Sequence, residues 1–253
     1  MPLVGSFALG FPLYVLPRPF AQIAGLIGDD TFIYELGGAA MLGCAVALAL
    51  GLRGAVWPPM RFVVLATYVF VAVAFLAGFV AFASNQISGF VVALSIWAVL
   101  VAWALAQILV ARRGAVAGPR DVASWVVAVL ALATVSAAVF GLGPQLPGPF
   151  ASLMGYRGTD EIVYRLAGAA CFGYAVMGVQ ELRSLHWDDM RLPNVMALVF
   201  NGLAFVAAVF EILAGRATLL VYLVALAAGF FTVAIAAIIA RRGRSSAESA
   251  HPR

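Results

Sequence analysis

The sequence predicts an all-α, polytopic transmembrane bundle of about eight helices, arranged as two parallel four-helix repeats. Composition is the first reason. Hydrophobic residues make up 64% of the 253 residues and charged residues only 10%, whereas an ordinary soluble domain is about half apolar and a quarter charged. Residues 62–111 and 122–156 contain no Asp, Glu, Lys, Arg or His. Runs of this length suit pairs of membrane-spanning helices of about 20 residues each.

An internal repeat is the second reason. Residues 16–113 recur without a gap at residues 146–243, with 32 identities over the 98 aligned positions. Because the register holds through loops as well as helices, the pattern indicates a duplicated gene. Four segments per repeat leave both copies in the same orientation, related by a pseudo-twofold axis along the membrane normal. We expect a first repeat at 1–113, a linker at 114–120, a second repeat at 121–243 and a polar tail at 244–253.

Eight hydrophobic segments account for the spans. The first has about 15 residues and contains Pro12, which predicts a short span or a half-span rather than a full crossing. A Pro-x-Pro-Phe element follows the first segment of each repeat and ends at Gly25 or Gly155, which is typical of a short interfacial helix or of a Pro-rich loop. The predicted segments are 2–16, 32–52, 62–83, 89–111, 122–143, 162–182, 194–214 and 217–240.

Arginine placement predicts the orientation. All 15 basic residues are Arg, and 11 of them fall on the side that holds loops 53–61, 112–121, 183–193 and the C-terminus. The positive-inside rule therefore predicts a protein of the cytoplasmic (inner or plasma) membrane, bacterial in type, with a cytoplasmic C-terminus. The N-terminus is cytoplasmic too if the first segment spans. Expected partners are the lipid bilayer and either other membrane subunits or a second copy of the chain. The charge of +4 lacks the aromatic-interleaved basic patch of a nucleic-acid binder.

Several chemistries are excluded by missing residues. Without Lys there is no Schiff base, and two His, at 186 and 251, supply neither a buried haem nor a metal site. No nucleophile elbow, phosphate-binding loop or zinc spacing occurs, so no catalytic residue is predicted. Cys44 and Cys171 lie in hydrophobic segments, as small core residues do. No cofactor is predicted; a bound quinone or lipid is left open.

The second segment of each repeat is the most patterned part of the chain. Ala39 and Gly43 are four residues apart in 34–43, as are Ala169 and Gly173 in 164–173, and small residues at this spacing favour close helix packing. The residues four positions before Ala39 and Ala169 carry charges. These charges therefore lie on the packing face and point into the protein.

The candidate buried polar cluster follows from that face. We expect Glu35, Arg165 and Glu211 at one depth, with Arg165 bracketed by the two carboxylates and with Tyr34 and Tyr164 as hydrogen-bond partners. Interfacial anchoring and a ligand or proton site are the alternatives. Asn201, which aligns with Val71, is the candidate midplane polar residue, for helix packing or substrate contact.

A family resemblance rests on the second repeat. Its helix, outer Pro-containing loop and patterned segment resemble the DoxX-like superfamily of four-helix membrane proteins, here in tandem; the matching residues are Tyr164, Arg165, Gly168, Ala169, Ala170 and Gly173. Glu35 departs from this pattern, which puts a shared role of the first repeat in doubt. The expected function is a non-enzymatic scaffold or partner-binding subunit of a membrane complex. A small transporter-like or lipid-binding permease is one alternative. The resemblance implies another, a quinone-linked redox subunit.

Overall fold

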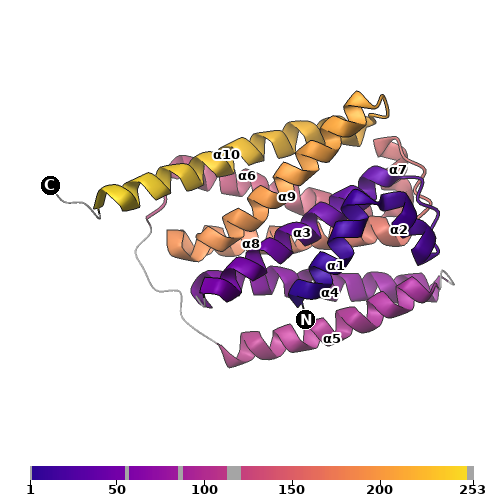
Figure 1. The fold of residues 1–253 in the computed structure, drawn as a ribbon, viewed down its shortest axis with the longest axis horizontal. Helices are drawn as coiled ribbons and strands as arrows, with labels where there is room; N and C mark the ends of the chain where they lie inside the picture. The colour runs from indigo at the N-terminus through magenta and orange to yellow at the C-terminus, as the bar shows by residue number, and fades with distance from the viewer. Residues whose placement is uncertain (1, 55–56, 85–87, 113–120, 250–253) are drawn as a thin grey trace.

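The protein is a bundle of long helices in the computed structural model, which describes residues 2–54, 57–84, 88–112 and 121–249. No β-strand occurs within these ranges (Figure 1). The helices are α1 (Pro2–Val15), α2 (Pro17–Ala24), α3 (Thr31–Gly54), α4 (Trp57–Ala83), α5 (Gly89–Ala111), α6 (Ser124–Leu142), α7 (Pro147–Met154), α8 (Glu161–Ser184), α9 (Trp187–Leu213) and α10 (Leu219–Ser249), with a 3-10 turn, η1 (Gly143–Gln145), after α6.

Seven of the described helices are long and apolar enough to cross a membrane, which confirms a multi-pass integral membrane protein. They are α3, α4, α5, α6 with η1, α8, α9 and α10 up to Arg241. The first segment is the short one, as predicted: α1 has 14 residues and meets α2 at an angle of 118°. Counting this bent pair as one span brings the total to eight.

The two Pro-x-Pro-Phe elements form short helices, α2 and α7, of 8 residues each. Proline occupies the first turn of both, where its missing N–H has no helical partner to lose. Gly25 and Gly155 end them in the left-handed conformation, with φ of 70° and 84°. Both lie at one end of the bundle, here called the proline end; the end of α3, the start of α4, the α8–α9 turn and the end of α10 lie at the other, the arginine end (Figure 1).

Two helices begin earlier than predicted. The predicted starts were 62 and 194, but α4 begins at Trp57 and α9 at Trp187. Charge and proline favoured a loop at 183–193, yet Asp188 and Asp189 lie in the first turn of α9, where acidic side chains complement the helix dipole. The expected loop 183–193 is therefore helical except at Leu185 and His186. The linker 114–120 lies outside the described residues, and α10 extends into the predicted tail to Ser249.

Equivalent helices of the two repeats make equivalent contacts. Within each repeat the first helix packs on the second (α1 on α3, α6 on α8) and the third on the fourth (α4 on α5, α9 on α10). The extensive contacts between repeats join α3 to α9 and α4 to α8. The centre of the bundle therefore combines α3, α4, α8 and α9, and the two repeats share one core.

Glycines allow these central helices to approach closely. A Cβ atom on Gly43 would lie 2.8 Å from the carbonyl oxygen of Met196 in α9, and one on Gly173 would lie 2.6 Å from that of Ala66 in α4. These two contacts occupy equivalent positions in the repeat alignment. Ala39 and Ala169, one turn earlier, are completely buried. The small-residue face identified in the sequence thus packs against the other repeat.

Candidate functional site

Two buried aspartates tie the repeats together at the proline end. The Asp160 carboxylate accepts hydrogen bonds from the backbone N–H groups of Ile27 (2.9 Å) and Gly28 (2.7 Å) and from the Tyr34 hydroxyl (2.6 Å). Asp160 is only 5% exposed. Because every one of these donors belongs to the first repeat, the carboxylate joins the two halves.

Asp30 makes the reciprocal set of bonds. It accepts from the backbone N–H groups of Arg157 (3.3 Å) and Gly158 (2.9 Å) and from the Tyr164 hydroxyl (2.7 Å). Gly158 has a φ of 71° and its counterpart Gly28 a φ of 77°, a conformation that presents the N–H groups of the loop to the carboxylate. We call the two sets together the aspartate clasps.

The clasps change the roles expected for the two tyrosines. Tyr34 and Tyr164 were predicted to hydrogen-bond with the Glu35, Arg165 and Glu211 cluster. Both are instead 1% exposed and donate to Asp160 and Asp30, which the sequence reasoning missed.

The three charges of that cluster are paired differently from the predicted bracket. Arg165 lies 2.7 Å from Glu161, one turn away on its own helix. Glu211 is 4% exposed and pairs with Arg216, which donates to both of its carboxylate oxygens. The partners of Arg165 and Glu211 lie within five residues of them in the chain, so these two ion pairs form inside the second repeat and not across the pseudo-twofold axis. Its hydrogen bonds with Glu211 raise the pKa of Arg216.

Glu35 lies beside this ion pair without joining it. Its Oε2 atom, the Tyr156 hydroxyl and the Thr218 hydroxyl are buried and lack a hydrogen-bond partner among the described residues. Burial raises the pKa of Tyr156 above its ordinary value, the adjacent Thr218 hydroxyl partly offsets that rise, and the nearby carboxylate of Glu211 adds to it. This end of α3 is polar but incompletely satisfied.

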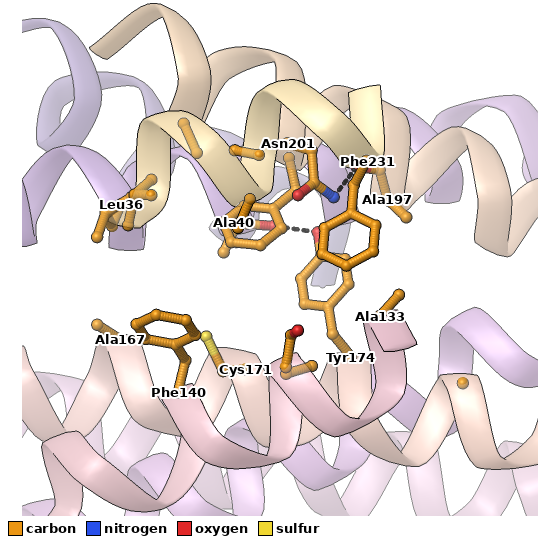
Figure 2. A pocket seen from close by; sticks show the side chains of 18 of the residues that line it. Leu36, Ala40, Ala133, Phe140, Ala167, Cys171, Tyr174, Ala197, Asn201 and Phe231 are labelled. Atoms are coloured by element: carbon orange, nitrogen blue, oxygen red, sulfur yellow. Dashed lines mark hydrogen bonds between the residues drawn. The ribbon is translucent and has the colours of Figure 1, made fainter. Parts of the chain in front are cut away.

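An apolar cavity of about 130 Å³ lies in the second half of the chain, between α6 and α8 on one wall and α9 and α10 on the other, with α3 behind. Figure 2 shows Phe140, Ala167 and Cys171 on one wall and Ala197, Asn201 and Phe231 on the other. The α8 residues that line it run from Tyr164 to Glu181, about 25 Å at 1.5 Å per helical residue. The cavity is therefore long and narrow and runs along the bundle.

Few polar groups interrupt this apolar lining. Asn201, the predicted midplane residue, lines the cavity and donates to the Ala197 carbonyl of its own helix (2.8 Å). The Tyr174 hydroxyl donates to the Ala40 carbonyl at 3.3 Å, and both residues line the cavity (Figure 2). Glu181 and Asn194 stand at the arginine end. The middle of the cavity thus offers mainly van der Waals contact.

Larger side chains occupy the equivalent region of the first repeat. Trp97 takes the place of Ala227, Met41 that of Cys171 and Leu48 that of Gly178. Trp97 reaches from α5 to α1, where a Cβ on Gly5 would lie 2.6 Å from its Nε1 atom. At two aligned positions the second repeat has the larger side chain: Phe140 aligns with Gly10 and Tyr174 with Cys44. Both of these larger residues line the cavity.

The described residues contain no group of three or more His, Cys, Asp or Glu that could hold a metal ion. Cys44 and Cys171 are both free thiols; Cys171 lines the cavity, whereas Cys44 hydrogen-bonds with Thr67 at 3.2 Å. The chain matches no family model, no curated protein and no solved structure. The DoxX-like resemblance therefore stays a prediction, and the cavity is the principal candidate site.

Proposed function

We propose that this integral membrane protein binds a single long apolar chain, of an acyl lipid or an isoprenoid, in the cavity of its second repeat. The observation that carries the proposal is the contrast between the halves: an apolar space is lined by Ala227 and Cys171 where the first repeat places Trp97 and Met41. This function corresponds to the lipid-binding alternative of the sequence analysis.

The energetics favour an occupant. At about 24 cal/mol per Å³, an empty apolar cavity of this volume costs roughly 3 kcal/mol. Water does not offset that cost, since it needs two to four polar partners that the lining lacks over most of its length. A hydrocarbon chain restores the missing contacts, and the cavity's length of about 25 Å is close to the hydrocarbon thickness of a bilayer, about 30 Å.

A route from the bilayer supports the same proposal. Trp97 bridges α5 and α1 in the first repeat, but Ala227 cannot bridge α10 and α6. Several of the lining residues on these two helices are small, among them Ala133, Ala137 and Ala228. We therefore place the entry of a chain from the surrounding lipid between α6 and α10.

The test fills the cavity with the residue that the first repeat uses. Wild-type protein and Ala227→Trp are purified from the same membranes, and bound lipids are extracted and identified by mass spectrometry. We expect about one equivalent of a long-chain compound with the wild type and a loss of at least tenfold with Ala227→Trp; the mass identifies it as acyl or isoprenoid. Leu226→Trp, at a site 76% exposed, is the matched control and should retain the compound. Equal retention by all three proteins would refute the proposal.

The scaffold role favoured by the sequence stays a prediction. It requires a partner that covers an exposed face, and the same purification reveals one as a stoichiometric second protein. The quinone-linked alternative shares the requirement for an isoprenoid chain, and it predicts that the extracted compound is a quinone and that activity is lost when both Cys44 and Cys171 are replaced by Ser.

A further inference from the structure

We infer that Glu181 and Asn194 form a head-group subsite at the arginine end of the cavity, selective for a chain that ends in a hydroxyl group. This inference rests on the proposed function and adds the chemistry of the ligand's polar end. It draws on two side chains that the sequence analysis did not single out.

Both side chains are buried deep in the bundle and both line the cavity. Glu181 is 4% exposed and Asn194 1% exposed. They come from α8 and α9, and the Asn194 amide donates to Oε1 of Glu181 at 2.9 Å. A buried carboxyl group and a buried amide are costly unless their hydrogen-bonding capacity is used. The site is therefore built, with fixed polar atoms at the end of an apolar tube.

The hydrogen bonds of Glu181 and Asn194 show which of their polar atoms still need a partner. The Asn194 amide nitrogen donates to Glu181 and also to the Met190 carbonyl (2.9 Å), so both of its N–H groups have acceptors. Among the described residues, Oε2 of Glu181 and Oδ1 of Asn194 take part in neither of these hydrogen bonds. Oδ1 of Asn194 is an acceptor, and the remaining oxygen of the Glu181 carboxyl accepts when ionised and can donate when protonated, so a ligand hydroxyl, which does both, matches this end of the cavity. A hydroxyl donates one hydrogen bond and occupies little volume.

The first repeat lacks this pair, just as it lacks the open cavity. Gly51 and Val64 stand at the equivalent positions. The Met60 side chain occupies the space that a Cβ on Gly51 would enter. Polar head-group recognition and chain binding are therefore confined to the same half of the protein.

The test compares two probes that differ only at the head. 1-Hexadecanol and its methyl ether are titrated onto delipidated full-length protein in detergent, and bound fractions are measured by native mass spectrometry. One hydrogen bond to an otherwise unpaired acceptor predicts about tenfold tighter binding of the alcohol. The Glu181→Leu/Asn194→Val double variant replaces both partners with apolar groups, which avoids leaving one of them unpaired. It should bind both probes, with the preference for the alcohol lost.

The outcomes of this titration separate failure of the head-group inference from failure of the chain-binding proposal. Equal binding of the two probes by the wild type would overturn the head-group inference and leave the chain-binding proposal standing. A preference that persists in the double variant would also overturn it. If neither probe binds the wild type while Leu226→Trp and wild type remain folded by circular dichroism, the proposed function itself fails. Ala227→Trp, which fills the tube and retains Glu181 and Asn194, should bind neither probe.

Discussion

The two halves of this protein share a framework and differ in what fills it. Both have the aspartate clasp, the short Pro-initiated helix and the glycine contact between central helices. Beside the second helix of each repeat, however, the first half is packed by Trp97 and Met41, whereas the second half has a cavity. The shared features hold the bundle together, and the feature that differs is where we place function.

Loss of a clasp should have the largest effect, and an equal one in both halves. Asp30→Ala or Asp160→Ala leaves a buried tyrosine hydroxyl and two backbone N–H groups, most of them partly buried, without an acceptor. At 1–3 kcal/mol for each unsatisfied group, we expect destabilisation of about 4 kcal/mol. Thermal unfolding in detergent measures it. The neighbouring Asp29→Ala, with its side chain 37% exposed, is the control and should change stability little. A large difference between the two clasp variants would show that the halves are not equivalent at this end.

Opening the first half should have the next largest effect. Trp97→Ala removes the side chain that bridges α1 and α5 and should cost about 3 kcal/mol, the usual range for such truncations. It should also create a second chain-binding space, detected as a second bound equivalent of 1-hexadecanol by native mass spectrometry. Trp103→Ala, at a site 66% exposed, is the matched control. Unchanged stability of the Trp97 variant would mean that this residue does not fill the first half.

The glycine contacts should follow, again with symmetric effects. Gly43→Ala and Gly173→Ala place a methyl group against a backbone carbonyl of the other repeat, and overpacking of this kind costs about 1–3 kcal/mol. Gly202→Ala, with nothing within 4 Å of its Cβ position, should instead be neutral or slightly stabilising, since alanine favours a helix. Chemical denaturation of the three variants under one condition gives the ranking; a tolerated Gly173→Ala would contradict the close approach of α8 and α4.

The exposed ion pair should matter least. Arg157 lies 3.0 Å from Asp29 with 76% of its side chain exposed, and its counterpart in the first repeat is Ile27. Arg157→Ile keeps the backbone N–H that Asp30 accepts, so the change should be under about 1 kcal/mol. The melting temperature at low and high salt checks this. A large loss of stability would mean that the Arg157 side chain, and not its backbone N–H, provides the stabilisation at this clasp.

Much of the fold could be predicted from the sequence because membrane helices leave strong signals. Long uncharged runs located the spans, and Pro and Gly bracketed α2 and α7. The starts of α4 and α9 were set too late, since the charges and prolines near Trp57 and Trp187 are typical of loops but here occupy first helical turns. Such boundaries depend on tertiary packing.

The candidate site was harder to predict, because the predicted cluster consisted largely of residues that differ between the repeats, whereas the clasp residues do not differ. Asp30 and Asp160 are identical in the alignment, as are Gly28 and Gly158, and that identity was the signal for the clasps. The pairing of Arg165 with Glu161 could not be separated from longer-range pairing, since side-chain reach alone allows both. Asn201, which differs from Val71 in the alignment, lines the cavity, but the space beside it depends on the absence of a bulky residue at Ala227. A small residue such as Ala227 leaves a cavity only if no neighbouring side chain fills the space, and the sequence alone does not show those neighbours.

The most direct measurement is a density map of the wild-type protein in lipid nanodiscs. We predict continuous chain-like density between α6, α8 and α10, running from the level of Tyr164 to that of Glu181, and none in the equivalent space beside Trp97. An empty second-half cavity, or chain density of equal strength in both halves, would contradict it.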